Sequence, residues 1–207
     1  LFDSLQVPET VFSGIQPVAA LLSARHVTSM LQSLPRRHHK GDAGHLLVVG
    51  GALGMGGAVR LAGEAALRVG AGLVSVATRL EHAGYLNSGC PELMANGIES
   101  GPDLSALLQR ATAVVAGPGL GMESWGRDLL SRVLEIELPL VVDADGLNLL
   151  SEQPTTRTNW ILTPHPGEAA RLLYLSTREV QADRLTAARR IQERYGGVCV
   201  LKGAGTL

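Results

Sequence analysis

The sequence lacks three features that mark large classes of protein. It has no basic surplus, since 18 Lys and Arg stand against 19 Asp and Glu in 207 residues, and this balance does not suit binding to nucleic-acid phosphates. It has only two cysteines, Cys90 and Cys199, which lie far apart without metal-ligand spacing and so predict buried or free thiols in a reducing compartment. It also has no apolar run as long as a membrane span and no signal-peptide pattern. We therefore expect a cytoplasmic protein that binds neither nucleic acid nor a membrane.

The first part of the chain differs from the rest. Residues 1–22 show no sustained period of helix or strand and are broken by prolines and a glycine, which predicts a linker or the tail of a preceding domain. Ser23 is placed to cap a short helix that runs to about Leu34. We expect the main domain to occupy residues 23–207.

Short apolar runs recur along the main domain. They predict strands at 45–50, 73–77, 113–116, 140–142, 160–162 and 198–201. Apolar residues at helical spacing between about 56 and 69 predict the first of the helices that separate these strands. Continuous apolar strands joined by helices are typical of a parallel sheet covered on both faces. We predict a three-layer α/β fold, in which ligands bind beyond the carboxyl ends of the strands.

Two of the loops at predicted strand ends are rich in glycine, namely residues 50–58 and 117–121. Glycines allow backbone amides to approach a ligand closely at a helix start, so a diphosphate or an amide-bearing ring would fit there. The alternative is a pair of plain tight turns, because neither the Rossmann spacing nor a Walker lysine is present.

Two further loops carry charged side chains. Asp143 and Asp145 follow a predicted strand and are suited to hold Mg²⁺ or ligand hydroxyls, although either could instead cap a helix. Pro164 and Pro166 fix the backbone around His165, which can donate or accept near neutral pH and so orient a substrate. Glu168, three residues on, is a candidate to engage Mg²⁺ through water; its alternative role is to complement a helix dipole.

The last predicted strand is followed by Lys202, Gly203, Ala204, Gly205 and Thr206. One cation, flexible amides and a hydroxyl in a row suit the phosphates of a nucleotide. A Lys-Gly turn by itself would be an ordinary surface loop, but this one completes a set of glycine-rich loops at strand ends.

Several short motifs follow one another in a fixed order from about Lys40 to Leu207. They are Lys-Gly-Asp at 40–42, Gly-Gly-Ala-Leu-Gly-Met-Gly-Gly-Ala at 50–58, Gly-Glu-Ala-Ala-Leu-Arg at 63–68, Gly-Ala-Gly at 70–72, Pro-Glu-Leu-Met at 91–94, Gly-Pro-Gly-Leu-Gly at 117–121, Asp-Ala-Asp at 143–145, Thr-Pro-His-Pro-Gly-Glu-Ala at 163–169 and Lys-Gly-Ala-Gly-Thr at 202–206. This series resembles the NAD(P)H-hydrate dehydratases, a family with the ribokinase-like fold.

The resemblance implies an activity and a set of site residues. Ala58, Gly121 and His165 would contact the hydrated nicotinamide nucleotide, and residues 202–206 would bind ADP or ATP. The implied reaction removes water from the S form of hydrated NADH or NADPH. Because a hydroxyl is a poor leaving group, the family couples its loss to nucleotide hydrolysis, with Mg²⁺ neutralising the transferring phosphoryl group.

The resemblance also implies that more protein is needed. The family continues into a Gly-x-Gly-Asp turn whose aspartate is the catalytic base, and no such turn occurs in this sequence. We therefore expect a domain that is truncated at its carboxyl end, has its catalytic aspartate beyond Leu207 and is inactive alone. Residues 1–17 resemble the end of the NAD(P)HX epimerase domain of bifunctional bacterial proteins, which implies an epimerase on the same natural polypeptide. Superfamily relatives often form homo-oligomers.

Two other functions stay open from the sequence. One is a vitamin-precursor kinase of the same superfamily, which would share the sheet, the glycine loops and a Lys-Gly segment; the Thr-Pro-His-Pro-Gly-Glu loop argues against it. The other is a fragment that binds a nucleotide without catalysis, which the missing aspartate makes credible.

Overall fold

The computed structural model describes residues 6–31, 37 and 39–207, and the chain divides into two compact units, Leu1–His38 and His39–Leu207. The first unit contains α1 (Glu9–Phe12) and α2 (Ala24–Met30), and its residues 10–31 are all exposed. The helix after Ser23 begins where the sequence predicts, but it ends at Met30 rather than near Leu34, which lies outside the described residues.

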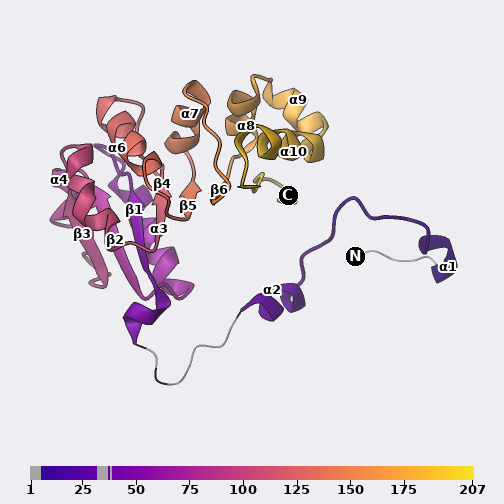
Figure 1. Cartoon of the computed structure of the whole chain (residues 1–207), viewed down its shortest axis with the longest axis horizontal. Coiled ribbons are helices and arrows are strands. Elements are labelled where there is room, and N and C mark those ends of the chain that lie inside the picture. The colour runs from indigo at the N-terminus through magenta and orange to yellow at the C-terminus, as the bar shows by residue number, and fades with distance from the viewer. Residues whose placement is uncertain (1–5, 32–36, 38) are drawn as a thin grey trace. The chain divides into compact units, whose positions relative to one another are not determined.

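The second unit is built on a seven-stranded sheet in which every pair of neighbouring strands is parallel (Figure 1). The strand order is β3-β2-β1-β4-β5-β6-β7. The strands are β1 (His45–Val49), β2 (Leu73–Thr78), β3 (Leu93–Gly97), β4 (Ala113–Ala116), β5 (Leu140–Val142), β6 (Trp160–Leu162) and β7 (Val198–Cys199).

Helices pack on both faces of this sheet, so the predicted three-layer α/β fold is confirmed. The second unit contains η1 (Lys40–Ala43), α3 (Gly56–Arg68), α4 (Leu80–Ala83), η2 (Gly101–Leu104), α5 (Ser105–Leu108), α6 (Ser124–Leu134), α7 (Asp145–Glu152), α8 (Pro166–Leu173), α9 (Thr177–Ala182) and α10 (Arg184–Tyr195). Within the described ranges, no helix is long and apolar enough to cross a bilayer.

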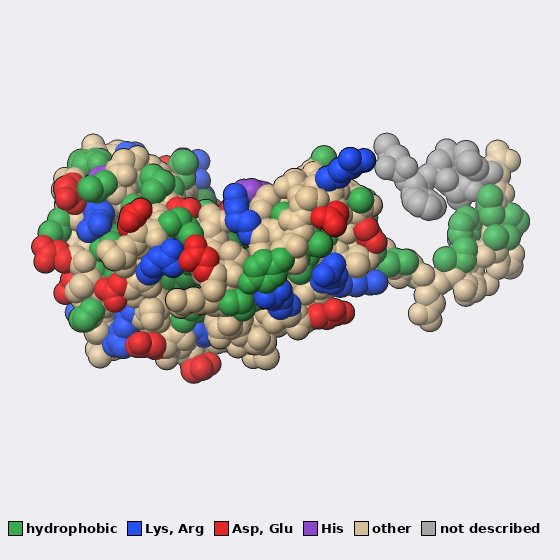
Figure 2. Space-filling model, turned by 90° about the horizontal axis from the view of Figure 1, so that it is seen from above, with side chains coloured by type: hydrophobic (Ala, Val, Ile, Leu, Met, Phe, Trp, Pro, Cys, Tyr) green, Lys and Arg blue, Asp and Glu red, His purple; other side chains and the backbone are tan. Residues whose placement is uncertain are grey.

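The continuous apolar strands are explained by burial on both sides of the sheet. Neighbouring residues of β1 belong to different hydrophobic clusters: Leu47 and Val49 lie in one, and Val48 packs with Val59 of α3 in the other. All of these side chains are fully buried, as expected for an interior strand of a parallel sheet that is covered on both faces. Acidic and basic side chains are interspersed over the face that Figure 2 shows.

Two details of the sheet differ from the sequence prediction. β3 was not predicted, because it is an edge strand that pairs only with β2 and its Met94 is exposed, so it carries no continuous apolar run. β7 ends at Cys199 instead of extending to Leu201. The chain turns there because the backbones of Leu201 and Leu207 donate hydrogen bonds to each other, and Lys202 N donates to Pro164 O.

Candidate functional site

The loops singled out in the sequence lie side by side at one edge of the sheet. Strands β1, β4, β5, β6 and β7 are successive neighbours and all run in the same direction, so their carboxyl ends share one edge. The loops at residues 50–56, 117–121, 143–145, 163–168 and 201–207 follow these strands in that order. We call this edge the carboxyl rim. The topology thus gathers every predicted site loop in one place, as the parallel sheet predicted from the sequence requires.

The two glycine-rich loops are joined to each other by their backbones. Gly51 N donates to Pro118 O at 3.0 Å, and Ala52 N donates to Gly119 O at 2.6 Å. A Cβ at Gly121, where φ is +77°, would lie 3.2 Å from the Cβ of Ala52. A Cβ at Gly119 would lie equally close to Ala58. The positions predicted to touch the substrate from these two loops are therefore brought together across a junction with little room for side chains.

Two buried side chains that no sequence motif indicates contact the backbone of the first glycine loop. Thr78 Oγ1 donates to Gly51 O at 2.9 Å, and His82 Nδ1 lies 3.1 Å from the same oxygen. Thr78 is fully buried and His82 is 5% exposed. Because a carbonyl oxygen only accepts, Nδ1 carries a proton in this contact. A threonine that ends a strand and a histidine in the next short helix give no sequence signal for this role.

Asp143 and Asp145 have separate partners and neither caps a helix. The cap position of α7 is Ala144, which makes no side-chain capping bond, so the capping alternative is wrong. Asp145 Oδ2 accepts from Gly121 N at 2.9 Å, which links the second glycine loop to α7. Asp143 Oδ1 lies 2.5 Å from Lys202 Nζ. Ala144 has φ 48° and ψ −121°, a conformation that costs a residue with a side chain about 1–3 kcal/mol.

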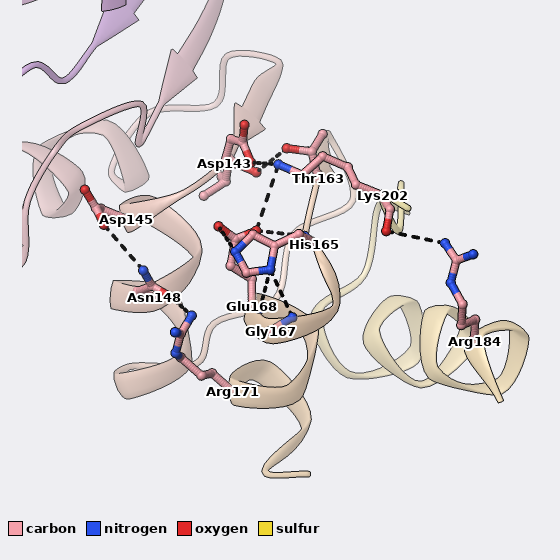
Figure 3. A network of polar contacts seen from close by, with 11 residues as sticks. Asp143, Asp145, Asn148, Thr163, His165, Gly167, Glu168, Arg171, Arg184 and Lys202 are labelled. Atoms are coloured by element: carbon pink, nitrogen blue, oxygen red, sulfur yellow. Dashed lines mark hydrogen bonds and ion pairs between the residues drawn. The ribbon is translucent and has the colours of Figure 1, made fainter. Parts of the chain in front are cut away.

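The loop between β6 and α8 fixes the ring of His165 (Figure 3). His165 Nδ1 accepts from Gly167 N at 2.9 Å and from Glu168 N at 3.3 Å, and Glu168 Oε2 in turn accepts from His165 N at 2.8 Å. This reciprocal capping box starts α8, with Pro166 at its first position. Since Nδ1 acts as an acceptor, the proton of the neutral ring is on Nε2, which lies 3.2 Å from Glu168 Oε1. Glu168 therefore does more than complement a helix dipole.

Lys202 places a cation between two carboxylates from different loops. Besides Asp143 Oδ1, its Nζ lies 3.9 Å from Glu168 Oε2. The Glu168 side chain is 6% exposed, whereas those of Asp143 and Lys202 are 32% and 39% exposed, so the ammonium and one carboxylate face solvent. Figure 3 shows His165 and Lys202 in the same polar network.

The acidic side chains at the rim fit a magnesium ion that arrives with a nucleotide. Among the described residues, no three His, Cys, Asp or Glu side chains are grouped so that they could hold a metal alone. Mg²⁺ commonly takes one or two carboxylates and completes its shell with water and substrate phosphates. Asp143, whose side chain is 32% exposed, would supply such a carboxylate directly, whereas both oxygens of Glu168 contact His165 or Lys202, so Glu168 would engage the ion through water.

A further side chain at the rim has no signal in the sequence. Arg184, the first residue of α10, donates hydrogen bonds to backbone carbonyls of residues 201–204. Gly203, Ala204, Gly205 and Thr206 are exposed. An arginine at a helix start has no pattern that would point to a loop almost twenty residues later.

Comparison with known proteins agrees with this arrangement. Residues 46–207 match the model of a family described as NAD(P)H-hydrate dehydratase. The chain belongs to the NAD(P)H-hydrate dehydratase family. It is 53% identical over 207 residues to the bifunctional NAD(P)H-hydrate repair enzyme of Coxiella burnetii. The alignment covers all of this chain and 42% of the length of that enzyme. The chain thus spans about two fifths of the length of curated relatives of this kind.

Comparison with solved structures shows that this member of the dehydratase family has the ribokinase-like fold. A ribokinase-like superfamily protein from Enterococcus faecalis superposes with a TM-score of 0.81 at 29% identity, over 89% of this chain and 66% of that one. An ADP/ATP-dependent NAD(P)H-hydrate dehydratase from Bacillus subtilis, co-crystallised with ATP and Mg²⁺, superposes with a TM-score of 0.75 at 30% identity, over 88% and 66% of the two chains.

Proposed function

We propose that this chain forms the dehydratase part of an enzyme that restores NADH and NADPH from the S forms of their hydrates, using ADP or ATP with Mg²⁺. The family membership supports this activity. The single structural observation that carries the proposal is the carboxyl rim, where two joined glycine loops lie beside the fixed His165 and the paired Lys202.

The rim offers two neighbouring places for ligands. We assign the hydrated nicotinamide nucleotide to Ala58, Gly121 and His165, because the first two lie at the junction of the glycine loops and the third holds a fixed imidazole nearby along the rim. We assign the adenine nucleotide to residues 202–206, whose exposed glycines leave room for phosphate groups at the backbone. In the order of the strands, Asp143 lies between Gly121 and His165, and Glu168 lies on the His165 loop, next to the nucleotide loop.

This arrangement suits transfer of a phosphoryl group to a hydroxyl. A hydroxyl leaves a ring poorly. Once its oxygen has given its proton to a base and has taken the terminal phosphoryl group of ATP or ADP, it leaves as phosphate, the neighbouring ring carbon loses a proton to water, and the nicotinamide ring regains its double bond. Mg²⁺ would neutralise charge on the phosphates during the transfer. Lys202 would add a positive charge on the nucleotide side, while Asp143 and Glu168 keep its ammonium in place. We propose that the catalytic base lies outside residues 1–207.

The natural protein is proposed to be larger than this domain. The relative from Coxiella burnetii is named bifunctional, and we propose that residues 1–22 link the dehydratase, from residue 23 on, to an epimerase domain that supplies the S hydrate. We also propose that the protein is cytoplasmic and that it forms a homo-oligomer, as superfamily relatives often do.

Two measurements test this function. The full natural polypeptide should convert S-NADPHX to NADPH, seen as recovery of the NADPH absorbance band, only with ADP or ATP and Mg²⁺, whereas residues 1–207 alone should show no turnover. NADPH-like dinucleotides should raise the Tm of the chain, whereas hydroxymethylpyrimidine, thiazole or pyridoxal should not. Stabilisation by the vitamin alcohols alone would identify a kinase instead, and turnover by residues 1–207 would show that the base lies within them.

A further inference from the structure

Arg184 is fixed at the start of α10 by its own neighbour. Asp183 caps this helix, since its Oδ1 accepts from Thr186 N at 3.0 Å. The cap sets the first turn, and from there the Arg184 side chain reaches the loop at residues 202–206 (Figure 3). Its Nε is buried and has no partner among the described residues, so the guanidinium is packed between helix and loop rather than free in solvent.

The guanidinium binds three carbonyl oxygens of the same loop. Nη1 donates to Ala204 O at 2.9 Å, and Nη2 donates to Leu201 O at 3.2 Å and Lys202 O at 3.3 Å. A planar fork of donors can bridge several acceptors at once, which a single ammonium cannot do with the same geometry. Arg184 thus fixes the peptide planes on one side of the loop.

Fixing the carbonyls also fixes the amides. In a trans peptide the C=O and the N–H of the next residue point in opposite directions, and there is no cis peptide bond among the described residues. Because Lys202 O and Ala204 O point to the guanidinium, Gly203 N–H and Gly205 N–H point away from it. Within the described part of the chain, neither amide has a hydrogen-bond acceptor, and both glycines are exposed.

The guanidinium of Arg184 occupies the space that a side chain at position 203 would need. Its φ is +155°, and a Cβ at this position would lie 2.7 Å from Arg184 Nη2. Any side chain here would push the guanidinium away from the loop. The absent side chain and the three bonds to Arg184 therefore belong to one arrangement, in which two amides point away from the guanidinium and are free for an anion, as in other anion-binding backbone turns.

We propose that Arg184 is a positioning residue for nucleotide binding: it holds the loop so that the Gly203 and Gly205 amides face the phosphates of ADP or ATP. Three of the five N–H donors of Arg184 bond to loop carbonyls and its buried Nε has no partner, so its proposed role is to hold the loop rather than to bind the phosphates. This inference rests on the proposed assignment of residues 202–206 to the nucleotide.

The test compares Arg184→Gln and Arg184→Lys with Arg190→Gln, whose arginine is exposed on the same helix and donates no hydrogen bond to the loop among the described residues. The Kd values of ADP and of ATP with Mg²⁺ are measured by calorimetry in the full chain, together with the Kd of an NADPH-like dinucleotide. We expect Arg184→Gln to raise the nucleotide Kd about tenfold and to leave the dinucleotide Kd within about twofold.

Arg184→Lys keeps the charge but not the fork, so it should also weaken nucleotide binding by several fold, whereas Arg190→Gln should have no effect. Hydrogen exchange at Gly203 and Gly205 should be slowed by ADP in the native chain and less so in the Arg184 variants. If Arg184→Gln does not fold, Arg184→Lys decides the question. Unchanged nucleotide Kd in folded Arg184 variants, or equal losses for both ligands, would overturn the inference.

Lys202→Met separates this inference from the proposed function. Weaker nucleotide binding by Lys202→Met with no change in the Arg184 variants would refute the role of Arg184 and keep the site. If Lys202→Met and both Arg184 variants bind the nucleotide like the native chain, then the nucleotide does not bind at residues 202–206 and both proposals fall.

Discussion

Two alanine substitutions in the loop after β4 should differ strongly in their cost to folding, because the two glycines meet different surroundings. A Cβ at Gly117, where φ is +122°, would lie 1.8 Å from Asp143 O and 2.8 Å from Gly146 N, both backbone atoms. A Cβ at Gly121 would find only the Ala52 Cβ at 3.2 Å and the Met55 Cε at 3.9 Å. The first substitution collides with the loop after β5, and the second fills a junction that has nearly enough room.

The expected magnitudes follow from these contacts. For Gly117→Ala the loops after β4 and β5 must separate, so the free energy of unfolding should fall by at least about 3 kcal/mol and the domain should barely fold. For Gly121→Ala the cost is that of a left-handed conformation, about 1–2 kcal/mol. In a domain of this size it should lower the Tm by about 2–8 °C. The added methyl should nevertheless weaken binding of an NADPH-like dinucleotide by about tenfold, if Gly121 contacts it as proposed.

The assay is thermal unfolding of each variant followed by calorimetric titration with the dinucleotide. Gly84→Ala is the control, since Gly84 has φ −70° and a Cβ there meets nothing within 4 Å; its affinity should be that of the native chain, and its Tm should be native or slightly higher because alanine restricts the unfolded chain. A Gly117→Ala protein with a native Tm would refute the steric argument. Native dinucleotide affinity in Gly121→Ala would remove Gly121 from the binding site.

Three further predictions concern single side chains. His82→Leu removes one of the two donors to Gly51 O, so urea unfolding should show a loss of about 1–2 kcal/mol; an unchanged midpoint would contradict this. Ala144→Gly relieves the left-handed conformation at φ 48° and should raise the Tm by about 2–4 °C, and a lower Tm would be evidence against strain there. Burial raises the pKa of the Cys199 thiol to about 11, so about one thiol in a thousand is ionised at pH 8 and iodoacetamide should label it far more slowly than in the unfolded chain. Because the folded pKa lies above the ordinary value of 9.0, the stabilising contribution is full below pH 9 and is lost as the pH rises through 11; Cys199→Ala should reduce that alkaline loss, and identical pH profiles would contradict it.

The sequence determined the fold class and the positions of the site loops. Apolar runs such as His45–Val49 are local, and burial on both faces of a parallel sheet is their direct cause. Glycines, prolines and charges directly after these runs are equally local, so the carboxyl ends of parallel strands could be expected to gather them. The sequence does not predict β3, because an edge strand needs no continuous apolar run.

Tertiary structure alone decided which side chains hold these loops in place. Asp143 and Lys202 are 59 residues apart in sequence, His82 lies 31 residues from Gly51, and Arg184 is 18 residues from the Lys202 carbonyl it binds. Partners at such separations leave no periodic pattern, because their distance in the chain depends only on the intervening helices. Sequence patterns record the local rules of helix, strand and turn, while contacts across the rim arise only when the strands are paired in one order.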